Sequence, residues 1–206
     1  MLSMIKDISD EQATKMLNYI EGDHLTTKGR CRCLRNKLIV LLMLDAGLRV
    51  GEVIRLRRGS LIFANHFLES VVVTADIAKN NRERTVPMTV RIRIAVQQLS
   101  EMVWVPNDIG GIDYAFYGAS RREPLTTRQV ERIVSAAALA AFGVRIHPHQ
   151  LRHTFATRMM RICPMRVVQE LLGHKNLTST QIYTHPNGKD LKKAIADLDE
   201  QTLKAL

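Results

Sequence analysis

The chain has few of the features that mark secreted, disulfide-linked or membrane-spanning proteins. It contains three cysteines, an odd number, and one residue separates Cys31 from Cys33, so neither a disulfide framework nor a zinc ribbon is indicated. The apolar run at residues 38–44 is too short to span a bilayer, and the N-terminus lacks the pattern of a secretory signal. We therefore expect a protein of the reducing cytoplasm that has no membrane partner.

Acidic residues are also fewer than basic ones. The sequence has 20 Asp and Glu against 30 Lys and Arg, a net charge of +10, which favours a polyanionic partner without identifying one. Internal repeats and low-complexity linkers are absent. A length of 206 residues with 46% hydrophobic content suits one domain with a substantial core.

Hydrophobic periodicity predicts a mainly helical chain. We expect helices at about residues 9–22, 30–46, 49–56, 89–103, 127–143, 149–162, 164–172, 177–184 and 189–205. The period changes in between, and residues 61–63, 68–74 and 84–88 are predicted to be short strands. Residues 105–122 are irregular. The expected fold class is mainly α with a small three-stranded antiparallel sheet, an α+β arrangement.

Basic and phenolic side chains in the last third of the chain carry the strongest functional signal. His149, Arg152 and His174 precede Tyr183, and Arg49 lies upstream at the start of an expected helix, a position that favours anions. A tyrosine hydroxyl has a pKa of about 10, so it needs help to act as a nucleophile at neutral pH. Arginine forks match the nonbridging oxygens of a phosphodiester, and a histidine can bind the phosphate or move a proton at the tyrosine oxygen. The set points to phosphoryl transfer through a covalent tyrosine intermediate.

A leaving 5′-oxygen in such a reaction also needs a proton. Lys79 lies in a polar turn between two of the expected strands, from which its amine can reach into a site, and it is the candidate general acid. The chain has no G-x-x-x-x-G-K-[ST] phosphate-binding loop.

Several motifs together resemble the tyrosine recombinase (phage integrase) family, in particular its Xer-like members. They are HQLRHTFAT at residues 149–157, VVQELLGH at 167–174 and TQIYTH at 180–185, with GLRVGE at 47–52 and KNNRERTVP at 79–87 upstream. The resemblance covers about residues 9–198, and the motifs follow the order of the family. It implies a mostly helical catalytic domain that cuts and rejoins double-stranded DNA through a 3′-phosphotyrosyl link. The catalytic set that it implies is Arg49, Lys79, His149, Arg152, His174 and the nucleophile Tyr183.

The resemblance also implies partners and chemistry. No nucleotide cofactor is needed, because the phosphotyrosyl ester keeps the energy of the broken bond, and no metal is needed, because arginines supply the positive charge. Self-association on DNA, as a dimer or tetramer, is expected, and accessory DNA-bending proteins are candidate partners. Fewer than fifty residues precede Arg49, too few for the separate helical domain that members of this family commonly carry. We therefore expect residues 1–206 to form a single catalytic domain.

The tail at residues 189–206 is predicted to be a helix with an apolar stripe made by Leu191, Ile195, Leu198 and Leu203. From the sequence, this stripe either packs on its own domain or docks on a neighbouring subunit.

Alternatives from other classes stay open at this point. His149 and His153 are spaced as in zinc hydrolases of the H-E-x-x-H type, and His147 or His174 would add a third ligand. Gln150, however, replaces the glutamate base of that motif. A DNA-binding protein of the same fold that does not cut, and a type IB topoisomerase with similar chemistry, are the other two. Each candidate residue taken singly has an ordinary structural explanation, so the functional interpretation depends on their order and spacing.

Overall fold

The computed structural model describes residues 7–22, 26–64, 66–79 and 81–173. The helical elements are α1 (Asp10–Glu21), α2 (Thr27–Leu44), α3 (Val50–Arg55), η1 (Arg58–Ser60), α4 (Val90–Leu99), η2 (Ser100–Trp104), α5 (Thr127–Phe142), α6 (Pro148–Met160) and α7 (Met165–Leu172). The strands are β1 (Ile62–Phe63), β2 (His66–Phe67), β3 (Ser70–Val73) and β4 (Arg84–Pro87). The helices expected at about 177–184 and 189–205 lie outside the described residues.

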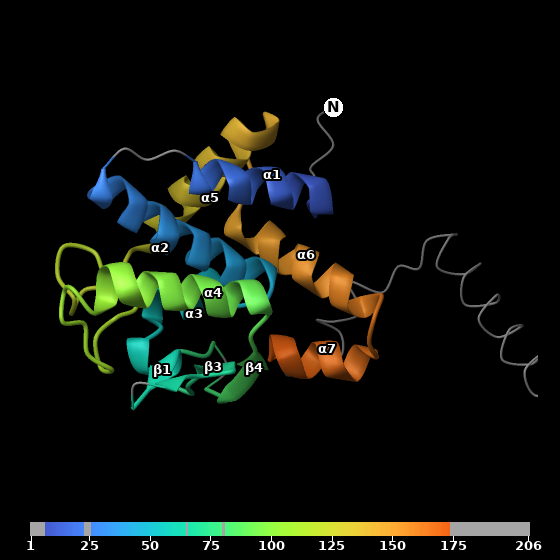
Figure 1. The fold of residues 1–206 in the computed structure, drawn as a ribbon. Coiled ribbons are helices and arrows are strands. Elements are labelled where there is room, and N and C mark those ends of the chain that lie inside the picture. Colours follow the sequence, from blue (N-terminus) through green and yellow to red (C-terminus); the bar gives the residue numbers. More distant parts are fainter. Residues whose placement is uncertain (1–6, 23–25, 65, 80, 174–206) are drawn as a thin grey trace, which may run out of the picture.

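Helix α2 runs through the middle of the molecule (Figure 1). Residues 38–44 at its C-terminal end are all buried, because α2 contacts α1, α4 and α6 on different sides. A helix that is covered all round needs apolar side chains all round, which explains the uninterrupted apolar run in the sequence. The short strands lie at one edge, and α7 packs beside β4 there. No helix among the described residues combines the length and the apolar character needed to cross a membrane.

Local capping signals set most helix ends. Ser9 and Gln12 form a capping box at the start of α1, and Gly143 ends α5 in the left-handed conformation with φ +77°. Thr126 is the N-cap of α5. Helix α2 begins earlier than expected, because the hydroxyl of Thr26 accepts a hydrogen bond from the Gly29 N–H at 3.1 Å.

The expected three-stranded sheet is wrong in its pairing. The described residues form two separate two-stranded antiparallel sheets, β1 with β2 and β3 with β4. The middle expected strand starts earlier, at His66, and the chain bends at Glu69, so its two halves pair with different partners. The expectation of a mainly helical fold with small antiparallel pairing is confirmed.

Residues 105–126 are irregular and largely exposed, but Ile109, Ala115, Phe116 and Leu125 are buried in the core. The chain leaves α4 through a π-helical turn, η2, at the end of which the fully buried Trp104 donates its indole N–H to the Ala115 carbonyl at 3.0 Å. Phe116 is also fully buried, and its carbonyl accepts from the Leu125 N–H at 2.9 Å. This segment therefore closes one end of the core instead of forming a free surface loop.

Candidate active site

Arg49 lies in the turn that joins α2 to α3. Gly47 in this turn has φ +64°, and a Cβ atom there would lie 2.3 Å from a ring carbon of Phe155 on α6, so the turn packs tightly on α6. The Arg49 N–H donates to Oε2 of Glu52 at 2.8 Å, and its Nη1 donates to Oε1 at 3.0 Å. Glu52 thus occupies the start of α3, where the sequence led us to expect a favourable place for an external anion.

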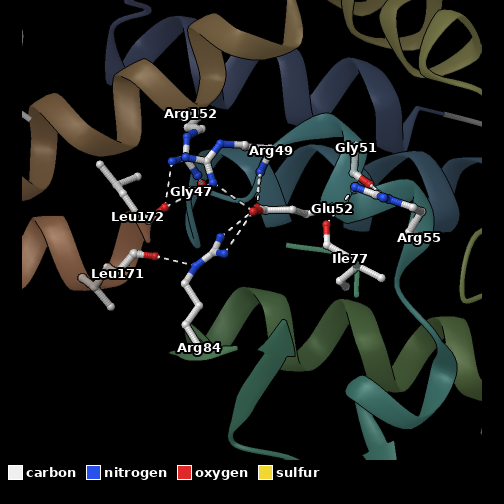
Figure 2. Close-up of polar contacts among 10 residues, drawn as sticks. All are labelled: Gly47, Arg49, Gly51, Glu52, Arg55, Ile77, Arg84, Arg152, Leu171 and Leu172. Atoms are coloured by element: carbon white, nitrogen blue, oxygen red, sulfur yellow. Dashed lines mark hydrogen bonds and ion pairs between the residues drawn. The ribbon is translucent and has the colours of Figure 1, made fainter. Parts of the chain in front are cut away.

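Arg152 on α6 reaches the same turn from the other end of the sequence. Its side chain is buried, with 2% of the residue exposed. Nη1 donates to the carbonyl oxygen of Gly47, 105 residues away in sequence, and Nη2 donates to that of Leu172 at 2.9 Å. Arg49 Nη1 donates to the same Leu172 carbonyl at 3.5 Å. The two guanidinium groups therefore converge on the last residue of α7, as Figure 2 shows.

His149 lies in the first turn of α6 and is exposed, although the surrounding protein still removes part of its solvation. This loss of solvation lowers the pKa of His149 from its ordinary value of 6.5. Positive charges lower this pKa further, and they come from Arg152, His153, Arg49 and Lys79. The imidazole is therefore neutral at neutral pH, so that it can accept a proton or a hydrogen bond.

Lys79 is exposed in the turn between β3 and β4, as the sequence predicts. This turn is tied to α3, because Arg55 donates from Nη2 to the Ile77 carbonyl and from Nε to that of Gly51, both at 2.8 Å. Lys79 is thus carried by a segment that is anchored to the helix beginning next to Arg49. The effect of its charge on His149 places the two within electrostatic reach.

Glu52 and Arg84 are buried and charged. Both lie within the motifs described above, but neither is among the site residues predicted from the sequence. Arg84 donates to both carboxylate oxygens of Glu52, at 3.0 and 2.7 Å, and its Nε donates to the Leu171 carbonyl at 3.0 Å. Burial acts to raise the pKa of Glu52, but the bonds and charges of Arg84, followed by those of Arg49, outweigh it, so that the pKa is lowered. One signal was present in the sequence: Arg84 is two residues from the buried Val86 on a strand, and alternate side chains of a strand share a face.

The remaining two predicted site residues, His174 and Tyr183, lie outside the described residues. Helix α7 ends at Leu172, and Gly173 follows in the left-handed conformation with φ +62°. The structure therefore brings Arg49 and Arg152 together at the Leu172 carbonyl, with His149 one turn before Arg152 on α6. Lys79 lies in the turn that Arg55 ties to α3.

The surroundings of the α6 histidines do not suit a cation. Within the part of the chain that the structure describes, no three His, Cys, Asp or Glu side chains form a group able to hold a metal ion. Arg152, Arg49 and Lys79 all place positive charge near His149. Such a field opposes a divalent metal ion and favours an anion.

Curated proteins similar in sequence to this chain are tyrosine recombinases. Tyrosine recombinase XerA of Pyrococcus furiosus is 33% identical over 193 residues, which cover 92% of this chain and 60% of that protein. Tyrosine recombinase XerC of Shewanella sp. (strain ANA-3) is 33% identical over 190 residues, covering 91% of this chain and 58% of that protein. The chain thus spans about 60% of the length of the curated relatives that it matches.

Solved structures show the same fold. The crystal structure of XerA recombinase matches 95% of this chain and 65% of its own, with a TM-score of 0.74 and 25% identity. A complex of the XerH site-specific recombinase bound to its difH substrate matches 94% of this chain and 54% of its own, with a TM-score of 0.70 and 22% identity. The model of the phage integrase family matches residues 6–190. The chain belongs to the phage integrase family.

Proposed function

We propose that this chain is the catalytic part of a site-specific DNA recombinase, which cuts and rejoins DNA strands through a covalent 3′-phosphotyrosyl intermediate. The observation that carries the proposal is the convergence of Arg49 and Arg152 on one carbonyl, that of Leu172, from opposite ends of the sequence. Two guanidinium groups held side by side are a preformed site for the nonbridging oxygens of a phosphodiester. Membership of the phage integrase family supports the same chemistry.

Each group has a distinct part in the proposed reaction. The Tyr183 oxygen attacks phosphorus, a new P–O bond to the tyrosine forms, and the bond to the 5′-oxygen breaks. His149, whose lowered pKa keeps the imidazole neutral, takes part at the tyrosine oxygen, where its free ring nitrogen can accept the proton. Lys79 donates a proton to the leaving 5′-oxygen, while Arg49 and Arg152 stabilise the charge on the nonbridging oxygens. His174 completes the set as a further phosphate ligand.

Rejoining is the same reaction in reverse. The 5′-hydroxyl of a second strand attacks the phosphotyrosyl bond, and the tyrosine leaves. Because one phosphoester replaces another in each step, no nucleotide cofactor is required.

The proposed substrate is double-stranded DNA. The net charge of +10 supplies long-range attraction to the phosphate backbone. We further propose that two or four copies assemble on DNA, since recombination joins two cut sites, with residues 189–206 as the contact between copies and DNA-bending proteins as accessory factors.

The experiment uses a pool of nicked duplexes with a randomised centre, so that no target sequence has to be assumed. The chain is incubated with the pool and denatured, and DNA that remains covalently attached to protein is recovered and sequenced. The wild-type chain is expected to yield an adduct. Tyr183→Phe is expected to yield none while its DNA affinity changes by less than about twofold, because only the nucleophilic oxygen is lost.

Other outcomes would change the conclusion. An adduct that persists in Tyr183→Phe would identify another nucleophile. DNA binding by the wild-type chain without any adduct would indicate a DNA-binding protein that does not cut. Relaxation of supercoiled plasmid without exchange between two recovered sites would indicate a topoisomerase.

A further inference from the structure

Arg84 joins three elements that carry or adjoin the proposed site. It lies on β4, which follows the turn of Lys79, and it binds Glu52 on α3 through both carboxylate oxygens. Its Nε donates to the Leu171 carbonyl at the C-terminal end of α7. The donor pattern of one guanidinium group is thus divided between α3 and α7, an arrangement that suits the planar fork of arginine.

Arg84 and Glu52 lie deeper in the protein than Arg49, the arginine that Glu52 also binds. The side chain of Arg84 is 5% exposed and that of Glu52 is 1% exposed, whereas 23% of the Arg49 side chain is accessible. Arg84 therefore lies behind Arg49, with Glu52 between them (Figure 2).

The sharing of Glu52 between Arg49 and Arg84 affects how much positive charge is available to bind a phosphate. Glu52 carries one negative charge, and with Arg49 as its sole partner that charge would offset the one that Arg49 needs for a phosphate. Arg84 takes the carboxylate bidentately, while Arg49 uses its backbone N–H and Nη1. The bonds of Arg49 to Glu52 therefore do not use its Nε and Nη2.

We propose that Arg84 is a positioning residue for strand cleavage: it fixes Glu52, and through it Arg49, together with the C-terminal end of α7, without contacting DNA. The inference rests on the proposed function. It adds to the site a residue that lies behind Arg49. It also gives β4 a role, which is to hold α3 and α7 in fixed positions relative to each other.

The test is Arg84→Lys in the full chain, because lysine keeps the buried positive charge beside Glu52 but lacks the fork. Arg82→Lys is the matched control. Arg82 is on the same segment and also contacts α7, through Glu170 at 3.3 Å, but both side chains of that pair are 68% exposed. The two variants make the same chemical change on the buried and exposed sides of one hairpin.

Two measurements are made on each variant. Amide hydrogen exchange of the DNA-free chain is expected to be about tenfold faster in peptides covering residues 165–173 of Arg84→Lys, and unchanged in Arg82→Lys. The single-turnover rate of adduct formation, on DNA recovered from the nicked pool, is expected to fall roughly 10- to 100-fold in Arg84→Lys, with DNA affinity within about twofold of wild type. Loss of rate at retained affinity distinguishes positioning from a general loss of folded protein.

A second variant covers the case in which Arg84→Lys does not fold. Glu52→Gln with Arg84→Met removes both buried charges together, which proteins often tolerate. We expect it to fold, bind DNA and react slowly.

Three outcomes would overturn the inference. They are a wild-type rate of adduct formation in either folded variant, unchanged hydrogen exchange of α7 in Arg84→Lys, and an equal loss of rate and DNA affinity. An adduct from the wild-type chain at the same time would leave the proposed function intact. No adduct from the wild-type chain would refute the proposed function itself.

Discussion

Gly47→Ala tests how tightly the turn before Arg49 is held against α6. At φ +64° an alanine pays a conformational cost of about 1–2 kcal/mol. Its Cβ would also lie 2.3 and 2.7 Å from two ring carbons of Phe155 and 3.1 Å from a methyl group of Leu172, which adds about 1–3 kcal/mol for overpacking. The free energy of unfolding should therefore fall by about 2–5 kcal/mol, a large part of the ~5–15 kcal/mol of a typical domain.

The assay is urea unfolding, followed by the fluorescence of the single, fully buried Trp104. Gly143→Ala is the control, because Gly143 has φ +77° and a Cβ there would meet nothing within 4 Å. It isolates the conformational part, about 1–2 kcal/mol. Equal losses in the two variants would show that Phe155 yields without cost, and the reasoning about the tight turn would be refuted.

Three further predictions concern the proposed site and the core. Lys79→Ala should slow cleavage of ordinary DNA about 100-fold and recover when the leaving 5′-oxygen is replaced by sulfur, which needs little protonation; Arg49→Ala should show no such recovery, and equal defects on both substrates would remove Lys79 from the role of acid. Because the folded pKa of His149 is lowered from 6.5, the unfolded chain binds more protons and stability falls as pH drops below about 6.5; His149→Gln should lose less stability than wild type between pH 7 and 5 in urea unfolding, and parallel pH profiles would contradict this. Trp104→Phe should cost about 1–3 kcal/mol in the same assay, since it leaves the Ala115 carbonyl without its indole donor, and a change below about 0.5 kcal/mol would contradict that estimate.

The sequence predicts those parts of the fold that depend on neighbouring residues. The capping box at Ser9 and Gln12 closes within one helical turn, so its residues identify the start of α1 without any tertiary information. Gly143 likewise ends α5 through its own conformational freedom. These signals are local, and the structure confirms both.

The sequence-based predictions that are wrong concern features set by contacts between segments far apart in the chain. The sheet is divided by the bend at Glu69: β2, before the bend, pairs with β1, and β3, after it, pairs with β4. Strand propensity does not predict which strand will be the partner. Helix α2 starts earlier than the apolar run predicts, because polar residues separate its N-cap, Thr26, from that run. Residues 105–122 show no regular period in the sequence, because their order comes from contacts with the core, such as that of Ala115 with Trp104.

The candidate site likewise contains some residues that the sequence predicts and others that it does not. Motif order predicts Arg49, Lys79, His149 and Arg152 as site residues. The structure joins Arg49 and Arg152 at the Leu172 carbonyl, and the charges of Arg152, Arg49 and Lys79 lower the pKa of His149. The ion pair of Glu52 with Arg84 links positions 32 residues apart. The strand pattern places Arg84 on the same face as Val86, but the sequence does not show that its acceptor is the buried carboxylate of Glu52.

The end of α7 explains how three arginines can lie close together in the absence of DNA. Arg84 donates to the Leu171 carbonyl, and Arg49 and Arg152 both donate to that of Leu172. The last carbonyls of a helix have no partner within the helix, and they carry a partial negative charge that favours cations by about 0.3–1 kcal/mol each. Together with Glu52, these carbonyls provide the negative counterpart of the arginine cluster. Because one carboxylate is shared by Arg49 and Arg84, these two arginines and Glu52 together carry a net positive charge, which is the condition for attracting a phosphate.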